Sequence, residues 1–348
     1  MKGYYGTTEY FSILNNNISE FYQELAISPG LRSASWILKG IDGREEIMSM
    51  LSVRQYTDFS AAEDSIEPEM KENEFWLPLG YTYDKWVKRD EFEQLNPLQK
   101  QKMMLEGAVL EEELQIEDKL SCSNVETKKT DYRVEYENIE ADESKLIATE
   151  NSKMRLYVDT SEDSVYVCLK DFVVYNAGVH EIYVGNKNLQ LRDQNDGYYM
   201  GSDEFWINVT ELKEENGHKY FDIYFLEECE FSFPKIEIYE HNIAEDTVRE
   251  RKEDVLEDIE WKNNRLTGKI EVQKPKLLFM SIPYSSGWKA YVDGNETEIL
   301  RANIGFLAVP VLEGEHEICF KYETPGIKIG FLCSIVSIFI SMYFLMKR

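Results

Sequence analysis

The fold is decided by residues 327–346, which read IKIGFLCSIVSIFISMYFLM. After Lys328 there is no further charge until Lys347 and Arg348. A helix needs about 20 mostly apolar residues to cross the hydrocarbon core of a bilayer. The three serines of the stretch do not prevent this, because a helical Ser can bond back to its own backbone. The alternative, a buried core helix, is rarely this long and this free of charge. The sequence therefore predicts one C-terminal transmembrane helix, with a lipid bilayer as partner.

The rest of the chain has the composition of a folded, acidic protein. It contains 348 residues, of which 43% are hydrophobic and 13% aromatic, and its formal net charge is −27. This length suggests two or three domains, and this hydrophobic content is sufficient for packed cores. Nucleic acid is excluded as a partner, because its phosphates require Lys and Arg. The same charge argues against a body that lies flat on an anionic lipid surface.

Residues 1–122 mix helix and strand patterns and are expected to form a mixed α/β region. The clearest local pattern is a helix that begins at Asn96-Pro97. Asn96 suits the N-cap and Pro97 the first turn, while Gln99 can bond back to the cap. Gly107 is expected to interrupt or end this helix.

Beyond this region the apolar pattern changes to period two. Residues 123–242 contain several short alternating runs separated by Asn- and Gly-rich turns, which predicts a β-sandwich-like domain. Residues 243–264 are rich in charge and are expected to form an amphipathic helical linker. Its apolar face would consist of Val248, Val255, Leu256 and Ile259.

Residues 265–325 are expected to form a second β-sandwich-like module. Asp293-Gly294 is the strongest short hairpin signal in the chain. Pro325-Gly326 ends the last strand and leads into the apolar segment at 327–346, so this module should lie against the bilayer surface. The predicted fold class is α+β and mainly β, with a mixed α/β N-terminal region, two β-sandwich-like modules and one C-terminal transmembrane helix.

The side of the membrane that carries the body is not decided by local patterns. The N-terminus lacks a charged start followed by an apolar segment, as a signal peptide would have. One alternative is a tail anchor with a cytoplasmic body; the other is the final part of a longer membrane protein. Lys347 and Arg348 favour a cytoplasmic C-terminus and an outer body, although Lys328 at the other end weakens this preference.

No motif in the chain demands catalysis, a metal or a cofactor. The phosphate-binding, nucleophile-elbow and zinc-protease motifs do not occur. Cys122, Cys168, Cys229 and Cys319 are widely spaced, which favours isolated thiols over a disulfide or a zinc site. The run Asp193–Gly197 faintly resembles a calcium loop, but a turn is the better interpretation. Whether the chain is an enzyme stays open.

One set of residues is suited to carbohydrate. Sugar sites stack apolar sugar faces on aromatic rings and bond hydroxyl groups to polar side chains. The candidate set consists of Trp288, Tyr291, Asp293, Arg301, Asn303 and Tyr322. The alternative is structural, with Trp288 in the core and Asp293 in the hairpin. A second aromatic group, with the same two interpretations, consists of Phe75, Trp76, Tyr81, Tyr83 and Trp86.

Several segments carry a resemblance to a known family. Residues 51–56 read LSVRQY, and residues 73–84 read NEFWLPLGYTYD. Residues 284–294 read YSSGWKAYVDG, and they are followed by RANIGF at 301–306, EGEH at 313–316 and YETPG at 322–326. In motif, order and position before a last span, these segments resemble the bacterial YfhO family of multispanning membrane proteins.

The resemblance implies a place and a function. Family members are similar to polyprenyl-phosphate-sugar-dependent glycosyltransferases that glycosylate cell-envelope polymers, with catalytic residues in a multispanning bundle. The chain matches the extracytoplasmic C-terminal part and the final span, so no catalytic residue is carried over. The expected function is an accessory extracytoplasmic portion of such a protein at the cell membrane, with a cell-envelope glycan or a multispanning protein as further partner. The alternative is a membrane-tethered carbohydrate- or protein-binding scaffold without a catalytic role.

Overall fold

The computed structural model describes residues 8–10, 15–27, 37–39, 41–58, 69–114, 118–142, 144–197, 199, 201 and 203–347. Of these residues, 46% lie in strands and 19% in helices. The predicted fold class is confirmed, because the protein is mainly β, has a mixed α/β N-terminal region, several sheets and one apolar C-terminal helix.

The N-terminal region combines short helices with short strands. Helix α4 (Pro97–Glu106) begins and ends as predicted: Asn96 and Gln99 form a reciprocal capping box, and Gly107 is the C-cap. The other elements are β1 (Thr8–Tyr10), α1 (Asn16–Glu24), β2 (Ile37–Lys39), α2 (Glu45–Met50), β3 (Gln55–Asp58), β4 (Glu69–Glu72), β5 (Gly80–Tyr83), β6 (Lys85–Lys88), α3 (Arg89–Phe92), β7 (Ala108–Leu110), β8 (Asp118–Lys119) and a 3-10 turn, η2 (Cys122–Asn124).

The middle of the chain forms two antiparallel sheets over one core. The first sheet has the order β10-β11-β17-β13-β14, with β16 and β18 attached, and the second has the order β15-β12-β19-β9. Leu156, Val167 and Phe225, from strands of both sheets, lie in the same buried cluster. The strands are β9 (Lys129–Thr130), β10 (Tyr132–Ala141), β11 (Leu146–Val158), β12 (Val165–Lys170), β13 (Val179–Val184), β14 (Lys187–Arg192), β15 (Phe205–Val209), β16 (Lys213–Glu215), β17 (His218–Phe225), β18 (Cys229–Phe231) and β19 (Lys235–Glu240).

The segment predicted as an amphipathic helical linker, residues 243–264, is only partly helical. Helix α5 spans Glu245–Arg251, and strand β20 occupies Glu257–Lys262. Leu256 is buried in the core of the following sheets, whereas Ile259 lies exposed on the strand. The periodic spacing therefore reflects a helix followed by a strand, because period-two and period-3.6 patterns overlap over so few residues.

The C-terminal part also consists of two sheets with a shared core, but one of them extends into the N-terminal region. One sheet has the order β20-β21-β27-β23-β24, and the other β5-β22-β26-β25-β7-β6-β8. Strand β22 pairs with β26 on one side and with β5 on the other. The strands are β21 (Arg265–Val272), β22 (Lys276–Pro283), β23 (Trp288–Val292), β24 (Asn295–Thr297), β25 (Leu300–Ala302), β26 (Phe306–Val311) and β27 (Gly314–Tyr322).

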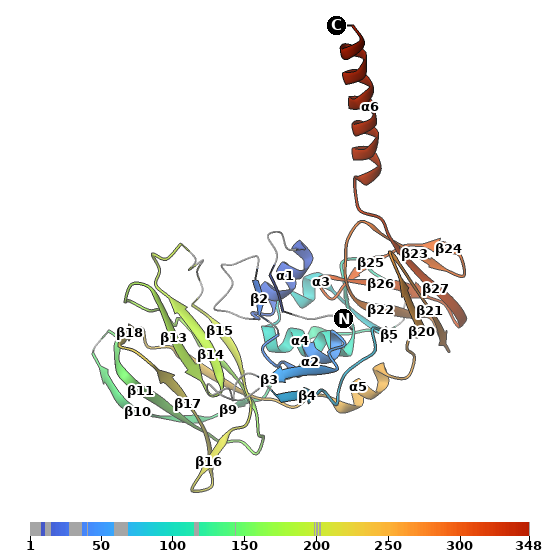
Figure 1. Cartoon of the computed structure of the whole chain (residues 1–348). Helices are drawn as coiled ribbons and strands as arrows, with labels where there is room; N and C mark the ends of the chain where they lie inside the picture. The colour runs from blue at the N-terminus through green and yellow to red at the C-terminus, as the bar shows by residue number, and fades with distance from the viewer. Residues whose placement is uncertain are drawn as a thin grey trace.

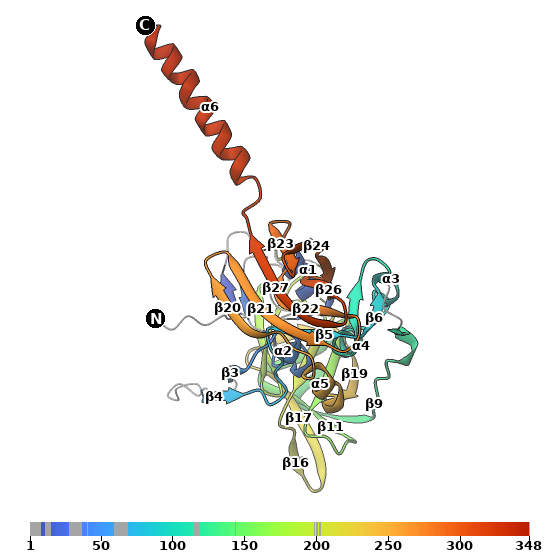
Figure 2. The same cartoon turned by 90° about the vertical axis from the view of Figure 1, so that its right-hand side faces the viewer.

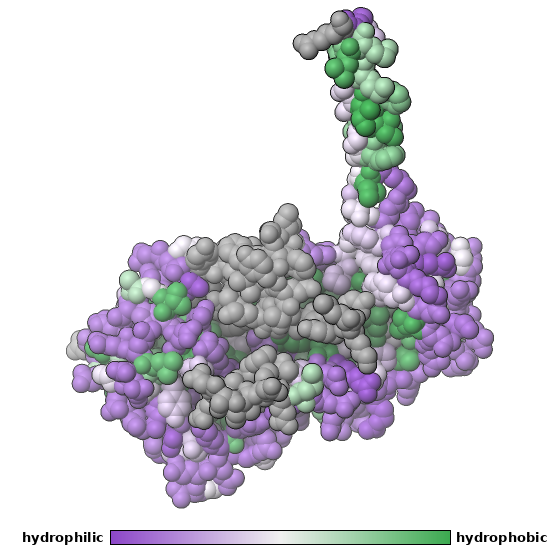
Figure 3. All heavy atoms as spheres, in the orientation of Figure 1, coloured by the Kyte–Doolittle hydropathy of each residue, from purple (hydrophilic) through white to green (hydrophobic). Residues whose placement is uncertain are grey.

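Helix α6 (Ile327–Met346) projects away from this body. Figures 1 and 2 show it leaving the side of the molecule that carries β23 and β27, while α5 and β4 lie on the side away from it, and β16 lies farther still. None of the helix is buried in the protein, and Figure 3 shows its apolar side chains standing clear of the polar body. Twenty residues at 1.5 Å each span about 30 Å, the thickness of the hydrocarbon core.

Candidate functional site

The segment between the body and α6 is held against the C-terminal sheets. The amide of Glu323 donates to the carbonyl of Gly287 at 2.9 Å, and the side chain of Asn264 donates to the carbonyl of Tyr322 at 2.7 Å. A Cβ atom at Gly287 would lie 2.5 Å from the carbonyl oxygen of Glu323 and 3.1 Å from Pro325. The chain is therefore packed on the body almost to the first residue of α6.

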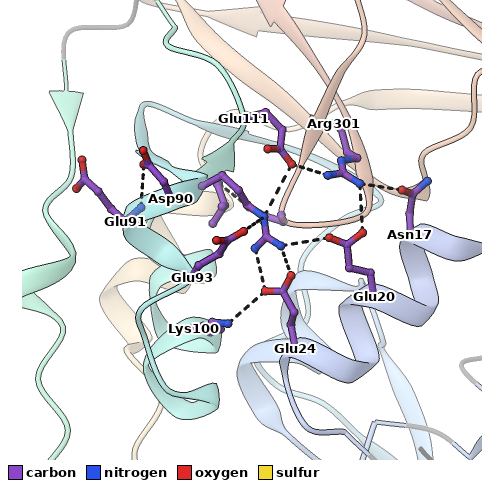
Figure 4. Close-up of polar contacts among 12 residues, drawn as sticks. Asn17, Glu20, Glu24, Asp90, Glu91, Glu93, Lys100, Glu111 and Arg301 are labelled. Atoms are coloured by element: carbon purple, nitrogen blue, oxygen red, sulfur yellow. Dashed lines mark hydrogen bonds and ion pairs between the residues drawn. The ribbon is translucent and has the colours of Figure 1, made fainter. Parts of the chain in front are cut away.

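A network of charged side chains joins α1 to the end of the sheet that contains β25. Its members are Asn17, Glu20, Glu24, Arg89, Glu93, Lys100, Glu111 and Arg301, and we refer to them as the polar network (Figure 4). Arg89 lies at its centre, with a side chain that is 9% exposed. Its guanidinium donates to Glu24 at 2.8 Å and to Glu20 at 3.2 Å.

The buried half of the polar network is electrostatically balanced. Burial by itself would raise the pKa of Glu24, but Arg89 and Lys100 outweigh it and lower that pKa below its ordinary value. Burial likewise opposes the charge of Arg89, and the carboxylates around it raise its pKa in spite of this. The pairs therefore hold α1 in place with both signs of charge retained.

The other half of the polar network faces solvent. Arg301 contacts Glu111, lies 3.3 Å from Glu20 and donates to Asn17 at 3.1 Å. The side chains of Glu93 and Glu111 are 53% and 46% exposed. This half offers carboxylate oxygens and an arginine fork in one place, which are groups that bond hydroxyls.

Three aromatic rings lie at the end of the sheet from which α6 leaves. Trp288 and Tyr322 are opposite each other on β23 and β27, with ring centroids 5.1 Å apart. Trp261 on β20 meets Trp288 edge-on at 6.3 Å. We refer to Trp261, Trp288 and Tyr322 as the aromatic cluster. Trp288 also packs on Phe320 of the core, whereas Trp261 is exposed, so the cluster extends from the core to the surface.

The remaining sugar-binding candidates lie elsewhere. Tyr291 is on the opposite face of β23 from Trp288, with the ammonium of Lys321 4.7 Å from its ring. Asp293 lies in the hairpin turn, where it accepts from the amide of Glu317 and contacts His316 at 2.7 Å. Asn303 is fully buried, and its side chain bonds Val109 and Tyr83. The six candidates therefore do not converge on one surface: Trp288 and Tyr322 meet, and Arg301 belongs to the polar network.

The second aromatic group is mostly core. Tyr81, Tyr83 and Trp86 are buried in the N-terminal hydrophobic cluster, and the hydroxyl of Tyr83 bonds the carbonyl of Met104. Phe75 and Trp76 are half-buried, and Trp76 lies beneath Arg54 at 5.2 Å.

A buried polar cluster, which the sequence did not suggest, joins the N-terminal region to the middle sheets. His241 lies 3.1 Å from Glu46 and 3.4 Å from the hydroxyl of Ser164, and Gln101 bonds both Glu46 and Tyr166. This order of groups resembles a hydrolase relay, but the side chains of His241 and Glu46 are each 1% exposed. This burial favours a structural role, and we interpret the cluster as a contact between the two regions.

The loop at Asp193 and the cysteines were considered above as a calcium loop and as disulfide or zinc ligands. The carboxylate of Asp193 accepts from the amides of Gly178 and Asn195, which makes its loop a hydrogen-bonded turn. The five cysteines carry free thiols. Within the described ranges, no group of three His, Cys, Asp or Glu side chains has the arrangement of a metal site.

The polar network could not be found from the sequence. Glu20 and Glu24 are one helical turn apart, which places them on one face of α1. Arg89 lies 65 residues from Glu24 along the chain, and no local pattern links the two.

Comparisons with known proteins agree with the membrane helix. The family model "Bacterial membrane protein YfhO" matches residues 1–334. The uncharacterized protein YfhO of Bacillus subtilis (strain 168) is 24% identical over 370 residues, which cover 99% of this chain. The chain spans 41% of the length of that relative.

Two solved structures were compared as well. A mutant of the arabinofuranosyltransferase AftD from Mycobacteria has a TM-score of 0.19 and 11% identity, covering 44% of this chain and 12% of that one. A cupin 2 conserved barrel domain protein from Leptotrichia buccalis has a TM-score of 0.12 and 15% identity, covering 57% and 92%. These scores are too low to establish a shared fold. The match to the family model over nearly the whole sequence is decisive, and the chain belongs to the YfhO family of bacterial membrane proteins.

Proposed function

We propose that this chain is an accessory, extracytoplasmic portion of a glycosyltransferase-like membrane protein of the YfhO type. Its body would hold or orient a cell-envelope polymer near a lipid-linked sugar, and a multispanning bundle would perform the transfer. Support comes from membership of the family and from the function that the resemblance to polyprenyl-phosphate-sugar enzymes implies. In this proposal the chain contributes position rather than chemistry.

The observation that carries the proposal is the close attachment of the body to α6. The linker packs on Gly287 up to Pro325, and α6 begins at Ile327. A body attached in this way stays at the membrane surface, where the sugar of a polyprenyl-linked donor also lies. Lys347 and Arg348, which follow α6, favour a cytoplasmic end of the helix and hence an outer body, although Lys328 at its other end weakens this preference.

Within the body, the exposed half of the polar network is the surface we assign to a glycan. The guanidinium of Arg301 lies within hydrogen-bonding distance of the amide of Asn17 and of the carboxylate of Glu111. A sugar with adjacent hydroxyls can donate to the carboxylates and accept from the arginine. The same surface supports the second candidate function, a membrane-tethered carbohydrate-binding scaffold that acts without a transferase.

A glycan array tests this assignment. The full chain in detergent micelles would be applied to bacterial cell-envelope glycans, together with the variants Arg301→Gln and Arg133→Gln. Arg133 is the control, because it forms an exposed pair with Glu135 on β10. We expect Arg301→Gln to weaken binding at least about tenfold, since a hydrogen bond to a charged group contributes about 1.5–3 kcal/mol.

Three outcomes would contradict the assignment. The first is no binding to any glycan, and the second is equal binding by both arginine variants. In the third, Trp288→Ala or Tyr291→Ala abolishes binding while Arg301→Gln does not. That last result would place the sugar at the aromatic residues instead.

A further inference from the structure

The end of the C-terminal sheets that carries α6 differs from the rest of the surface. Strand β27 ends there at Tyr322, β23 begins there at Trp288, and β20 brings Trp261 to the same end. Trp261 is 40% exposed, although a Trp residue is usually largely buried in a folded protein. Its indole nitrogen bonds the carbonyl of Asn263, so the ring is fixed in this exposed position.

The distance along the chain keeps the aromatic cluster near the point where α6 enters the bilayer. Four residues separate Tyr322 from Ile327, so even an extended linker would reach no more than about 18 Å. The linker is shorter than that, because the amide of Ile327 bonds back to the carbonyl of Thr324 and Glu323 is tied to Gly287. The cluster cannot move away from the membrane without breaking these contacts.

The uncharged part of α6 is no longer than the hydrocarbon core, so the residues that flank it lie at the interface. After Lys328 the helix has 18 residues to Met346, which span about 27 Å, whereas the hydrocarbon core is about 30 Å thick. A span that is slightly short is accommodated when flanking residues approach or enter the interface. Lys328 itself pairs with Glu323, which keeps the first turn of α6 close to the linker.

Trp and Tyr are the residues that favour this layer. Their rings have an apolar body and a polar atom, and they gather at the headgroup level of membrane proteins. Four exposed cations lie at the same end of the sheet but on its opposite face, where they form one register row, namely Lys262, Arg265, Lys321 and Lys289. Lys262 and Lys289 pair with Glu260 and Glu296, so this end is mixed in sign, in a chain whose net charge is −27. A sheet end with mixed charge on one face and aromatic rings on the other suits a layer of phosphates and amines.

We propose that the aromatic cluster is a second membrane contact, with Trp261, Trp288 and Tyr322 lying among the phospholipid headgroups of the bilayer that α6 crosses. The body is then fixed in orientation by two contacts, the helix and the cluster, rather than turning freely about one. This inference depends on the membrane helix and not on the glycan assignment, so either can fail without the other.

Quenching of tryptophan fluorescence tests the proposal. The full chain would be placed in phosphatidylethanolamine–phosphatidylglycerol vesicles whose lipids carry bromine near the headgroup or deep in the acyl chains. The chain has six tryptophans, so each signal is assigned by replacement. Trp261→Phe keeps an aromatic ring at an exposed position and leaves the fold intact. The control is Trp76→Phe, a half-buried tryptophan near Lys252, which follows α5 on the side of the body away from α6 (Figures 1 and 2).

We expect shallow bromine to quench the wild-type chain more strongly than deep bromine does. Trp261→Phe should remove at least a third of that shallow quenching, and Trp76→Phe should leave it unchanged. The combination of Trp261→Phe with Trp288→Phe should remove most of it. The proposal is overturned if shallow bromine does not quench, or if quenching is the same in wild type and in the Trp261→Phe chain.

Discussion

Arg251 shows how single residues hold this body together. Its side chain is 2% exposed and donates to the carbonyl of Thr82 in β5 and to those of Leu105 and Glu106 at the end of α4. Its charge is matched by Asp84, at 3.2 Å. A buried arginine with this many partners fixes the geometry of all of them, because losing one would leave a polar group unpaired.

The Asp84–Arg251 ion pair predicts that the free energy of unfolding depends on pH. Burial alone would raise the pKa of Asp84, but Arg251 and Lys274 outweigh it and lower the pKa to about 2. A carboxylate whose pKa is lower in the folded state stabilises the protein above its unfolded pKa, near 4, and loses that contribution as pH falls toward 2. We expect Asp84→Asn to lower the free energy of unfolding by about 2 kcal/mol at pH 7 and by much less near pH 2.

Thermal unfolding of the full chain in detergent, followed between pH 7 and pH 2.5, would measure this. Asp246→Asn is the matched control, since Asp246 pairs with Arg249 on the surface of α5 with both side chains more than 70% exposed. A difference between wild type and Asp84→Asn that stays constant over this pH range would disprove the interpretation.

Asn303 shows why a site residue can be misread from sequence. It follows Arg301 closely, and a polar residue there was a reasonable sugar ligand. In the structure its backbone has φ of +47°, which Asn tolerates, and its amide bonds Val109 and Tyr83. Those partners lie 194 and 220 residues away in the sequence, so no local pattern could indicate that this side chain fills the core.

At the scale of elements, local signals were sufficient where one short segment determines its own geometry. The capping box of α4 was predicted from Asn96, Pro97 and Gln99. The Asp293-Gly294 hairpin was also predicted, and both residues have the positive φ values, +52° and +78°, that a two-residue turn of this type requires.

Local sequence patterns could not predict which strands pair when they are far apart in the sequence. Strand β22 pairs with β5, and their partners Leu277 and Tyr83 are almost 200 residues apart. All four residues of β5 are buried in the structure, and such a run in a sequence does not say which sheet the strand joins, because it has no alternation to set a register. The polar network was missed for the same reason.

The connection between β27 and α6 makes a prediction at this scale. Gly287→Ala would place a Cβ atom 2.5 Å from the carbonyl oxygen of Glu323. This steric clash can be relieved only if the backbone of the linker moves. We expect the linker to leave the body, so that cleavage after Glu323 by a glutamate-specific protease rises about tenfold, as a loss of about 1.4 kcal/mol would produce. Mass spectrometry of the fragments would assign the cleavage to this site.

The control for that experiment is Gly197→Ala. A Cβ atom at Gly197 meets nothing within 4 Å, so this variant should be cleaved after Glu323 like the wild type. If Gly287→Ala is also cleaved like the wild type, the linker is not held by the contact at Gly287.

At the scale of the whole molecule, one acidic body is joined to one apolar helix with almost no free chain between them. The formal charge of −27 belongs to a body whose surface is largely polar in Figure 3, and among the described residues α6 is the one helix apolar and long enough to cross a membrane. The aromatic cluster and the polar network both lie in the half of the body nearer to α6. Orientation at the membrane therefore connects the two proposals made for this chain.

The central claim is that α6 crosses the bilayer with the body on the outer side. It is tested most directly by labelling cysteines in intact cells with a membrane-impermeant maleimide. In a Cys122→Ser background, one variant would carry Glu250→Cys on the exposed face of α5, and the other Lys347→Cys after α6. We predict that Glu250→Cys is labelled in intact cells and that Lys347→Cys is labelled only after permeabilisation. The reverse pattern, or a full chain that stays soluble without detergent, would contradict the account.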